Sequence, residues 1–183
     1  MTHAVIPSHF RLSLQPQADP AAIVRAHGVR FTVLTSRLIR LEHDPSERFE
    51  DRASQTFWYR RQPVPAIDVV RRDGTIEIIT EHLRLHYDER PGGFRRESLS
   101  IRVKDTGVTW RYGDRDRDNL LGTARTLGTA NGRIRLSPGL ISRAGWAVLD
   151  DSQSLVFNDQ SWLVSRGATT PDLYFFGYGR AYR

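Results

Sequence analysis

The stretch that decides the fold runs from residue 66 to residue 80 and reads Ala-Ile-Asp-Val-Val-Arg-Arg-Asp-Gly-Thr-Ile-Glu-Ile-Ile-Thr. Two runs rich in β-branched residues, 66–72 and 75–80, flank the dipeptide Asp73-Gly74. Both residues of this dipeptide tolerate a positive φ, which a two-residue turn between antiparallel strands requires. The stretch therefore predicts a β-hairpin, and this is the strongest hairpin signal in the chain.

Strand-like patterns continue on both sides of this hairpin. Residues 82–87 alternate apolar and polar side chains, which places His82 and His86 on the polar face of a strand. Further short strands are expected at residues 29–34, 38–42, 56–60, 98–104, 108–112, 134–136, 145–149, 154–157, 161–164 and 173–178. No stretch of ten or more residues has a 3.6-residue period. The sequence thus predicts an all-β fold class, an antiparallel two-sheet β-sandwich with little or no helix.

The length of 183 residues fits one domain of this kind. Residues 1–28 contain Pro7, Pro16 and Pro20 and are predicted to be irregular and to pack on the sandwich. Residues 29–183 are predicted to form the single β-sandwich domain.

Composition argues against several function classes. The chain has no cysteine, so disulfides and cysteine-bound metals are excluded. The net charge is +6, but the arginines are interleaved with acids along the whole chain, which argues against nucleic-acid binding. No apolar run reaches the ~18 residues of a membrane span, and the first ten residues carry no secretory pattern. We expect a cytoplasmic protein with neither a cofactor nor a metal, since His82 and His86 lack a third ligand.

Four segments of the chain resemble the region upstream of the catalytic barrel in family 31 glycoside hydrolases, the α-glucosidase/α-xylosidase family. They are residues 49–61 with Pro63 and Pro65, residues 122–127 with Asn131-Gly132, residues 138–143 with 145–152, and residues 172–179. Their order and spacing carry the resemblance, which covers about residues 29–183. It implies a galactose mutarotase-like β-sandwich that packs on a (β/α)8 barrel.

The resemblance also implies where the chemistry lies. Retaining glycoside hydrolysis needs two carboxyl groups about 5–5.5 Å apart, and in this family both are aspartates of the barrel. We therefore expect no catalytic residue in this chain and read Asp150 and Asp151 as a strand-end pair that caps a turn with Ser152. The expected function is that of a non-catalytic N-terminal domain. Its partner would be a (β/α)8 barrel encoded in the same or an adjacent reading frame.

A long polar segment, residues 113–133, is the candidate for a loop that this domain lends to the sugar pocket. Loops of this length inside compact domains are often functional. Four of its residues are predicted to form hydrogen bonds with an oligosaccharide: Arg125, Thr126, Thr129 and Asn131. Gly128 departs from the family pattern, because relatives often carry an aspartate there.

Two other functions compete with this one. A free-standing carbohydrate-binding module would use the aromatic residues as a stacking platform, although aromatic residues inside β runs mostly pack in the core. The aromatic residues concerned are Trp58, Tyr59, Trp110, Trp146 and Trp162. A mutarotase-like epimerase would use His82 and His86 with the flanking Glu81 and Glu89, but strand alternation predicts that the histidines lie on a solvated face.

The last apolar run adds an expectation about self-association. Phe175, Phe176 and Tyr178 stand where the family's sandwich meets its barrel. Without the barrel some of this surface would be exposed and would form an apolar patch, through which copies of the chain could associate.

Overall fold

A computed structural model describes residues 7–10, 12–122, 128, 131–167 and 170–182. Within these residues there are twelve strands, two three-residue 3-10 helices (Ser8–Phe10 and Pro20–Ala22) and no α-helix. The strands are β1 (Ile23–Ala26), β2 (Val29–Thr35), β3 (Leu38–His43), β4 (Asp68–Arg72), β5 (Thr75–Ile79), β6 (Leu83–Asp88), β7 (Leu99–Val103), β8 (Thr109–Arg111), β9 (Ala147–Asp150), β10 (Val156–Phe157), β11 (Leu163–Val164) and β12 (Asp172–Phe176). The all-β fold class with two antiparallel sheets is thereby confirmed. No helix long and apolar enough to cross a membrane occurs in this described part of the chain.

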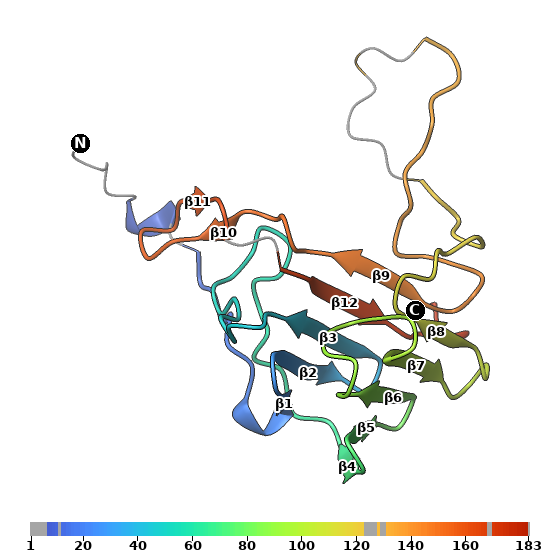
Figure 1. Cartoon of the computed structure of the whole chain (residues 1–183). Coiled ribbons are helices and arrows are strands. Elements are labelled where there is room, and N and C mark those ends of the chain that lie inside the picture. Colours follow the sequence, from blue (N-terminus) through green and yellow to red (C-terminus); the bar gives the residue numbers. More distant parts are fainter. Residues whose placement is uncertain (1–6, 11, 123–127, 129–130, 168–169, 183) are drawn as a thin grey trace. The chain divides into compact units, whose positions relative to one another are not determined.

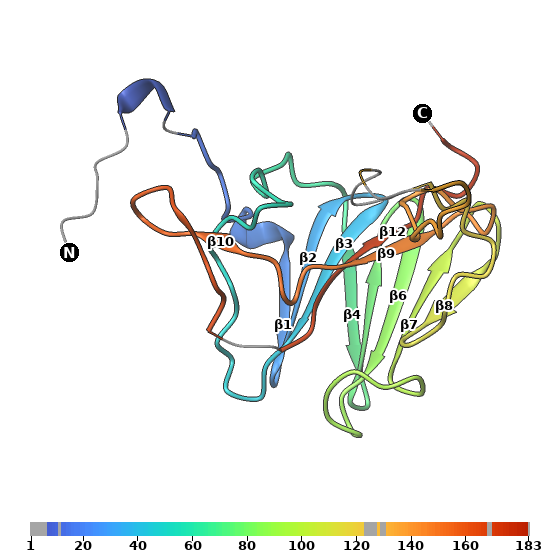
Figure 2. The ribbon, with the colours of Figure 1, turned by 90° about the horizontal axis from the view of Figure 1, so that it is seen from above.

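The strands form two five-stranded sheets and one short pair (Figure 1). One sheet has the order β1-β2-β3-β12-β9, and the other has the order β4-β5-β6-β7-β8, whose strands lie side by side in Figure 2. Among the described strands β10 pairs with β11, and its Val156 also forms an isolated bridge with Ser54. By its internal contacts the chain divides into two compact units. Unit 1 comprises Met1–Thr35, Ile39–Pro65 and Asp150–Tyr174, and unit 2 comprises Ser36–Leu38, Ala66–Leu149 and Phe175–Arg183.

The hairpin of β4 and β5 in unit 2 forms as predicted. Asp73 and Gly74 have φ values of 50° and 74°, as a two-residue turn requires. On the next strands, Ile78 pairs with Leu85 and Leu85 pairs with Ile101. All three side chains are fully buried, so the alternation read from the sequence marks the core face of this sheet.

An aromatic cluster completes the core of unit 2. The ring of Phe175 lies 5.3 Å from that of Trp110 and 6.3 Å from that of Trp146, and it is nearly parallel to the Trp146 ring. All three side chains are buried. Phe175 therefore contributes nothing to the partly exposed apolar surface expected at residues 175–178, because this ring is covered by aromatic residues of its own unit.

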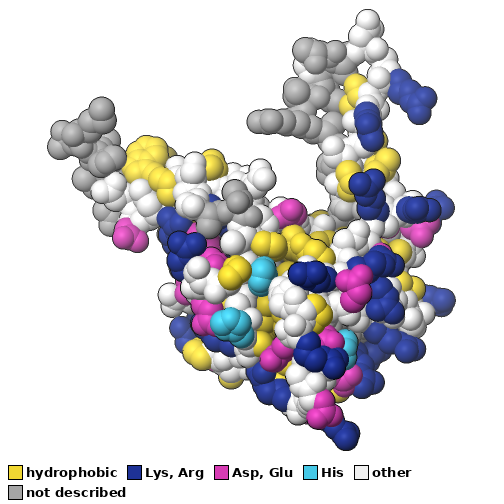
Figure 3. Space-filling view, in the orientation of Figure 1, with side chains coloured by type: hydrophobic (Ala, Val, Ile, Leu, Met, Phe, Trp, Pro, Cys, Tyr) yellow, Lys and Arg dark blue, Asp and Glu magenta, His cyan; other side chains and the backbone are white. Residues whose placement is uncertain are grey.

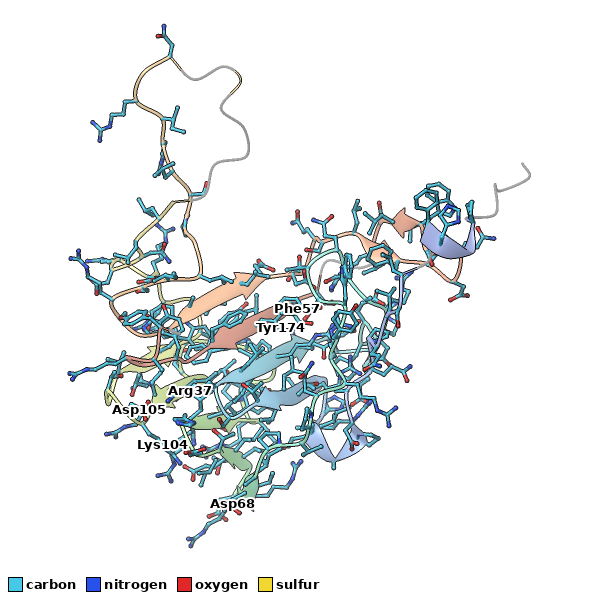
Figure 4. All side chains as sticks on the ribbon, turned by 180° about the vertical axis from the view of Figure 1, so that it is seen from behind. Arg37, Phe57, Asp68, Lys104, Asp105 and Tyr174 are labelled. Carbon is cyan, nitrogen blue, oxygen red and sulfur yellow. The ribbon has the colours of Figure 1, made fainter. Side chains whose placement is uncertain are left out.

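Polar contacts fix the turn between β5 and β6. The hydroxyl of Thr80 donates to the carbonyl of Ser36 at 2.7 Å and accepts from the backbone N–H of Leu83 at 3.0 Å. The exposed Lys104 follows β7, and its Nζ donates to the carbonyl of Thr80. Lys104, labelled in Figure 4, is the only lysine of the chain.

Unit 1 contains a buried network of arginines and carboxylates. Arg30 donates to Glu42 through two nitrogens, at 2.6 and 2.8 Å. Arg40 donates to both oxygens of Asp172 at 2.7 Å, and Arg166 adds a third contact to Asp172 at 2.7 Å. All five side chains are at most 7% exposed. These ion pairs satisfy most of the hydrogen-bond donors and acceptors of the five side chains. The charges are therefore tolerated in the interior of unit 1.

The adjacent acids Asp150 and Asp151 have different roles. The side chain of Asp150 accepts from the backbone N–H of Ser152 at 3.0 Å, which confirms the predicted turn cap. The side chain of Asp151 is fully buried and accepts from Arg166 at 3.0 Å. Asp151 therefore belongs to the arginine–carboxylate network and not to the cap.

The predicted strand at residues 56–60 is wrong. The structure has only isolated bridges in this region, one of which pairs Gln15 with Tyr59. The side chains explain the irregular path, because Phe57 stacks on Tyr174 at 3.4 Å and Arg60 donates to the Tyr174 hydroxyl at 2.6 Å (Figure 4). Burial raises the pKa of Tyr174 to about 12, so this hydroxyl stays protonated at neutral pH.

Two further expectations are corrected. β1 (Ile23–Ala26) lies within the first 28 residues, which were predicted to be irregular, and it pairs antiparallel with β2. Four residues are too few for a periodic signal, so the pattern did not reveal this strand. Residues 134–136 form no strand, because they belong to the long segment between β8 and β9.

We expect Asp172→Ala to lower the free energy of unfolding by about 3–5 kcal/mol, since the change leaves Arg40 and Arg166 buried with an uncompensated charge. Urea unfolding followed by circular dichroism measures this loss. Arg84→Ala is the control, because Arg84 pairs with Glu77 on the surface and should cost about 1 kcal/mol or less. Equal losses in the two variants would contradict the assigned role of Asp172.

The same carboxylate should make stability depend on pH. Burial raises the pKa of Asp172, but hydrogen bonds and charges from Arg40 and Arg166 outweigh it and lower the pKa below its ordinary value. The stabilisation is therefore present above the unfolded-state pKa of about 3.9 and is lost as the pH falls through the native pKa. The difference in urea midpoint between the wild type and Asp172→Ala should shrink over this acidic range. A difference that stays constant would refute the linkage.

Candidate functional site

The long segment between β8 and β9 extends away from β8 in Figure 1, where it is drawn in yellow to orange. Three of the four predicted sugar-binding residues, Arg125, Thr126 and Thr129, lie outside the described residues. Asn131 is described and exposed. What the structure does define is the base of this loop, where residues 114–121, 135–146 and 178–182 meet.

Asn119 is the hub of the loop base. Its side-chain nitrogen donates to the carbonyl of Gly139 at 2.9 Å, and its oxygen accepts from the backbone N–H of Gly139 at 2.9 Å. The same oxygen accepts from the backbone N–H of Leu121, also at 2.9 Å. Leu121 has a φ of 59°, which is unusual for a leucine. One amide group thus joins the two arms of the loop and holds a strained residue.

Asp116 connects this hub to the second arm. Its carboxylate accepts from Asn119 at 2.9 Å and from the hydroxyl of Ser142 at 2.8 Å. The backbone N–H of Asp118 also donates to it, at 3.0 Å. Backbone bonds from Leu120 to Ile141 and from Arg143 to Asp118, both 3.0 Å, complete a short ladder between the arms.

Tyrosine hydroxyls close the loop base from the C-terminal side. The Tyr178 hydroxyl accepts from the backbone N–H of Ser142 at 2.5 Å, and the Tyr182 hydroxyl donates to the carbonyl of Ser142 at 3.2 Å. Burial raises the pKa of Tyr178. Arg37 holds this segment in turn, since it donates to the carbonyl of Tyr178 at 3.0 Å and pairs with Asp105 at 2.9 Å (Figure 4).

A backbone crossing leaves no room for a side chain at this point. Gly145 has a φ of 76°, and a Cβ placed on it would lie 2.6 Å from the carbonyl oxygen of Gly179. The backbone N–H of Gly179 donates to the carbonyl of Gly145 at 2.8 Å. Glycine is therefore required at position 145 both by conformation and by space.

A pocket of about 460 Å³ opens beside the loop base. It is lined by Asp114, Arg115, Asp116, Asn119, Arg135, Pro138, Gly139, Trp146 and Val148. Its guanidinium groups can donate to hydroxyl oxygens and its carboxylates can accept from them. Trp146 is only 6% exposed, so it offers an edge and not a stacking face.

Both carboxylates of the pocket already have structural partners. Asp114 accepts from the side chain of Arg96 and from the backbone N–H of Arg111. Burial raises the pKa of Asp114, but these hydrogen bonds and charges outweigh it and lower the pKa below its ordinary value. Asp114 is therefore an anion at neutral pH, which suits an acceptor of hydrogen bonds and not a general acid.

The other candidate side chains do not converge on a site. The ring of His82 contacts the hydroxyl of Ser36 at 3.0 Å and is less exposed than predicted, and His86 lies 3.8 Å from Glu77 on the strand surface. The described residues contain no group of three or more side chains that could hold a metal ion.

Some of the aromatic residues are exposed. Trp110 and Trp146 are buried in the core as predicted, whereas Tyr59 and Trp162 are 54% and 47% exposed. In the predicted apolar patch, Phe176 and Tyr178 are only partly exposed. The exposed apolar residues near Tyr178 are instead Leu140, Ile141 and Tyr182, which line a hollow of about 180 Å³.

Sequence reasoning missed the residues that organise the site. Asn119, Asp116 and Ser142 lie in irregular chain, where hydrogen bonds leave no periodic pattern. One local signal was present, because aspartate and asparagine side chains often accept from the backbone two residues ahead. Asp116 to Asp118 and Asn119 to Leu121 are both contacts of this type.

We expect Asn119→Ala to loosen the loop base, because four hydrogen bonds are lost together. Trypsin should cleave after the loop arginines about tenfold faster than in the wild type, as the loss of a part-buried hydrogen-bonding group implies. Mass spectrometry of the fragments locates the cuts. Asn131→Ala is the matched control on the exposed part of the loop and should leave the rate unchanged. Equal rates in both variants would show that Asn119 does not hold the loop.

No protein-family model and no curated protein matches the chain.

Proposed function

We propose that this chain is a non-catalytic β-domain of an α-glucosidase-type glycoside hydrolase. It supports a separate catalytic (β/α)8 barrel and presents the loop of residues 113–133 to the sugar pocket of that barrel. The observation that carries the proposal is the loop base. Asn119, Asp116 and Ser142 hold both arms of an otherwise polar loop in one arrangement. A loop that positions a ligand needs such support from a rigid element.

The state of the pocket carboxylates favours a supporting role over hydrolysis. A glycosidase needs one carboxyl group that can donate a proton and a second that attacks the sugar or activates water. Asp114 has a lowered pKa, and the carboxylate of Asp116 accepts three hydrogen bonds from its own loop. Neither is poised for that chemistry, so the reactive acids would come from the partner.

The lining of the pocket suits a neutral hydroxylated ligand. Arg115 and Arg135 supply donors, and the outer lone pairs of the two aspartates supply acceptors. The volume of about 460 Å³ falls within the usual range for small-molecule pockets. Because both signs of charge are present, a sugar fits this lining better than an anion or a cation.

A free-standing carbohydrate-binding module is the second candidate. The exposed rings of Tyr59 and Trp162 favour it, since an exposed aromatic face can stack on a sugar. The two functions use different residues, so substitutions can separate them.

Calorimetric titration with maltose, isomaltose and xylose-containing oligosaccharides tests the proposal. We expect weak binding that Arg135→Ala reduces about tenfold, because a charged hydrogen bond is lost. Trp162→Ala should leave this binding unchanged, and so should the surface control Arg84→Ala.

The opposite pattern, with binding lost in Trp162→Ala only, would favour the free-standing module. Turnover of an aryl α-glucoside by the purified chain, or no heat with any sugar at millimolar concentration, would contradict the proposed role.

A further inference from the structure

The edge strand β4 has an unusual surface. Among the strands that the structure describes, β4 has one bonded neighbour, β5. All five of its residues are exposed, including the adjacent Val69 and Val70, which are 43% and 48% exposed. Figure 3 shows acidic and basic side chains next to one another at the lower tip, where Figure 1 draws β4. An open edge with exposed valines is a template for another strand.

The hairpin geometry determines which main-chain groups point outward. Arg72 and Thr75 flank the two-residue turn and therefore form a hydrogen-bonded pair. Since such pairs alternate along an antiparallel ladder, Asp68 and Val70 also direct their main-chain groups toward β5. Val69 and Arg71 direct theirs toward the open side, and Arg71 also pairs through its side chain with Glu89.

The length of the open edge is limited at both ends. Pro63 and Pro65 precede the strand and cannot donate hydrogen bonds, and the turn at Asp73 ends it. An added strand can therefore pair with the five residues Asp-Val-Val-Arg-Arg and, before them, with at most Ala66 and Ile67.

This five-residue pattern is complementary to itself. We propose that β4 pairs antiparallel with β4 of a second copy of this chain, centred on Val70. In this register Asp68 lies opposite the second copy's Arg72, and Arg72 lies opposite the second copy's Asp68. The outward main-chain groups of Val69 then lie opposite those of the second copy's Arg71 and can form hydrogen bonds with them. The main-chain hydrogen bonds and the ion pairs therefore require the same register.

The two neighbouring registers do not form both ion pairs. If the two-fold axis passes through Arg71 and not Val70, Arg71 lies opposite Arg71 of the second copy. Like charges directly opposite one another destabilise a sheet. A shift toward Val69 places Asp68 opposite Val70, so both ion pairs are lost. Asp68, labelled in Figure 4, takes part in none of the ion pairs within the described part of its own chain. Arg72 lies 3.2 Å from its neighbour Asp73, but both side chains are more than 80% exposed, so this contact holds Arg72 only weakly.

The symmetry of the pattern favours a second copy over an unrelated strand. A two-fold axis through Val70 produces both ion pairs from one sequence, as an isologous interface requires. A contact of two five-residue strands buries little surface, so we expect a weak dimer with a dissociation constant in the micromolar to millimolar range.

Sedimentation equilibrium of the full chain over a range of concentrations tests the proposal. Asp68→Arg and Arg72→Asp each place like charges opposite one another and should raise the dissociation constant about tenfold. The double variant Asp68→Arg with Arg72→Asp restores both pairs in reverse and should recover the wild-type dissociation constant. Arg61→Asp matches the charge change of Arg72→Asp at an exposed site elsewhere and should have no effect.

Val69→Pro tests the contribution of the main-chain hydrogen bonds without changing any charge. It removes an N–H that faces the open side, so the β4–β5 ladder and the circular dichroism spectrum should stay intact while the dimer is lost. A wild-type chain that stays monomeric into the millimolar range would overturn the proposal. A dimer unaffected by Val69→Pro, or a double variant as weak as the single ones, would overturn it too.

Discussion

Two arginines converge on one buried carboxylate, that of Asp172, and the rest of the structure depends on this contact. Asp172 begins β12, which lies between β3 and β9 in its sheet. Hydrogen bonds from Arg40 and Arg166 hold the side chain of this first strand residue in place. The residues that follow then take successive roles within their own units. Tyr174 holds Arg60, Phe175 packs on two tryptophans, and Tyr178 closes the loop base.

Local patterns predicted part of this fold and no more. The hairpin at Asp73-Gly74 and the alternation of β6 were evident, because turn chemistry and a period of two are encoded in adjacent residues. The burial of Arg40 was not, since its partner Asp172 is 132 positions away. An aromatic run at residues 56–60 resembled a strand, but its side chains dock on Tyr174 and the backbone follows them.

The candidate site shows the same limit more clearly. The long loop could be recognised from its polar composition, but its anchoring could not. Asn119, Asp116 and Ser142 act through hydrogen bonds between segments twenty or more residues apart. Gly145 was part of a recognised segment, yet only the structure reveals the backbone of Gly179 against it. A fixed base lowers the entropic cost of ordering the two arms that it joins.

Lys104 gives this molecule a practical property. It is the single lysine among the 27 lysine and arginine side chains, and it is exposed. Lys104 directly follows β7, and its Nζ donates to the carbonyl of Thr80. Amine-directed dyes or cross-linkers would therefore find one reactive side chain, at a known point just after β7, besides the α-amino group. Fluorescence or cross-linking distances measured from that point would have a defined origin without any engineered residue.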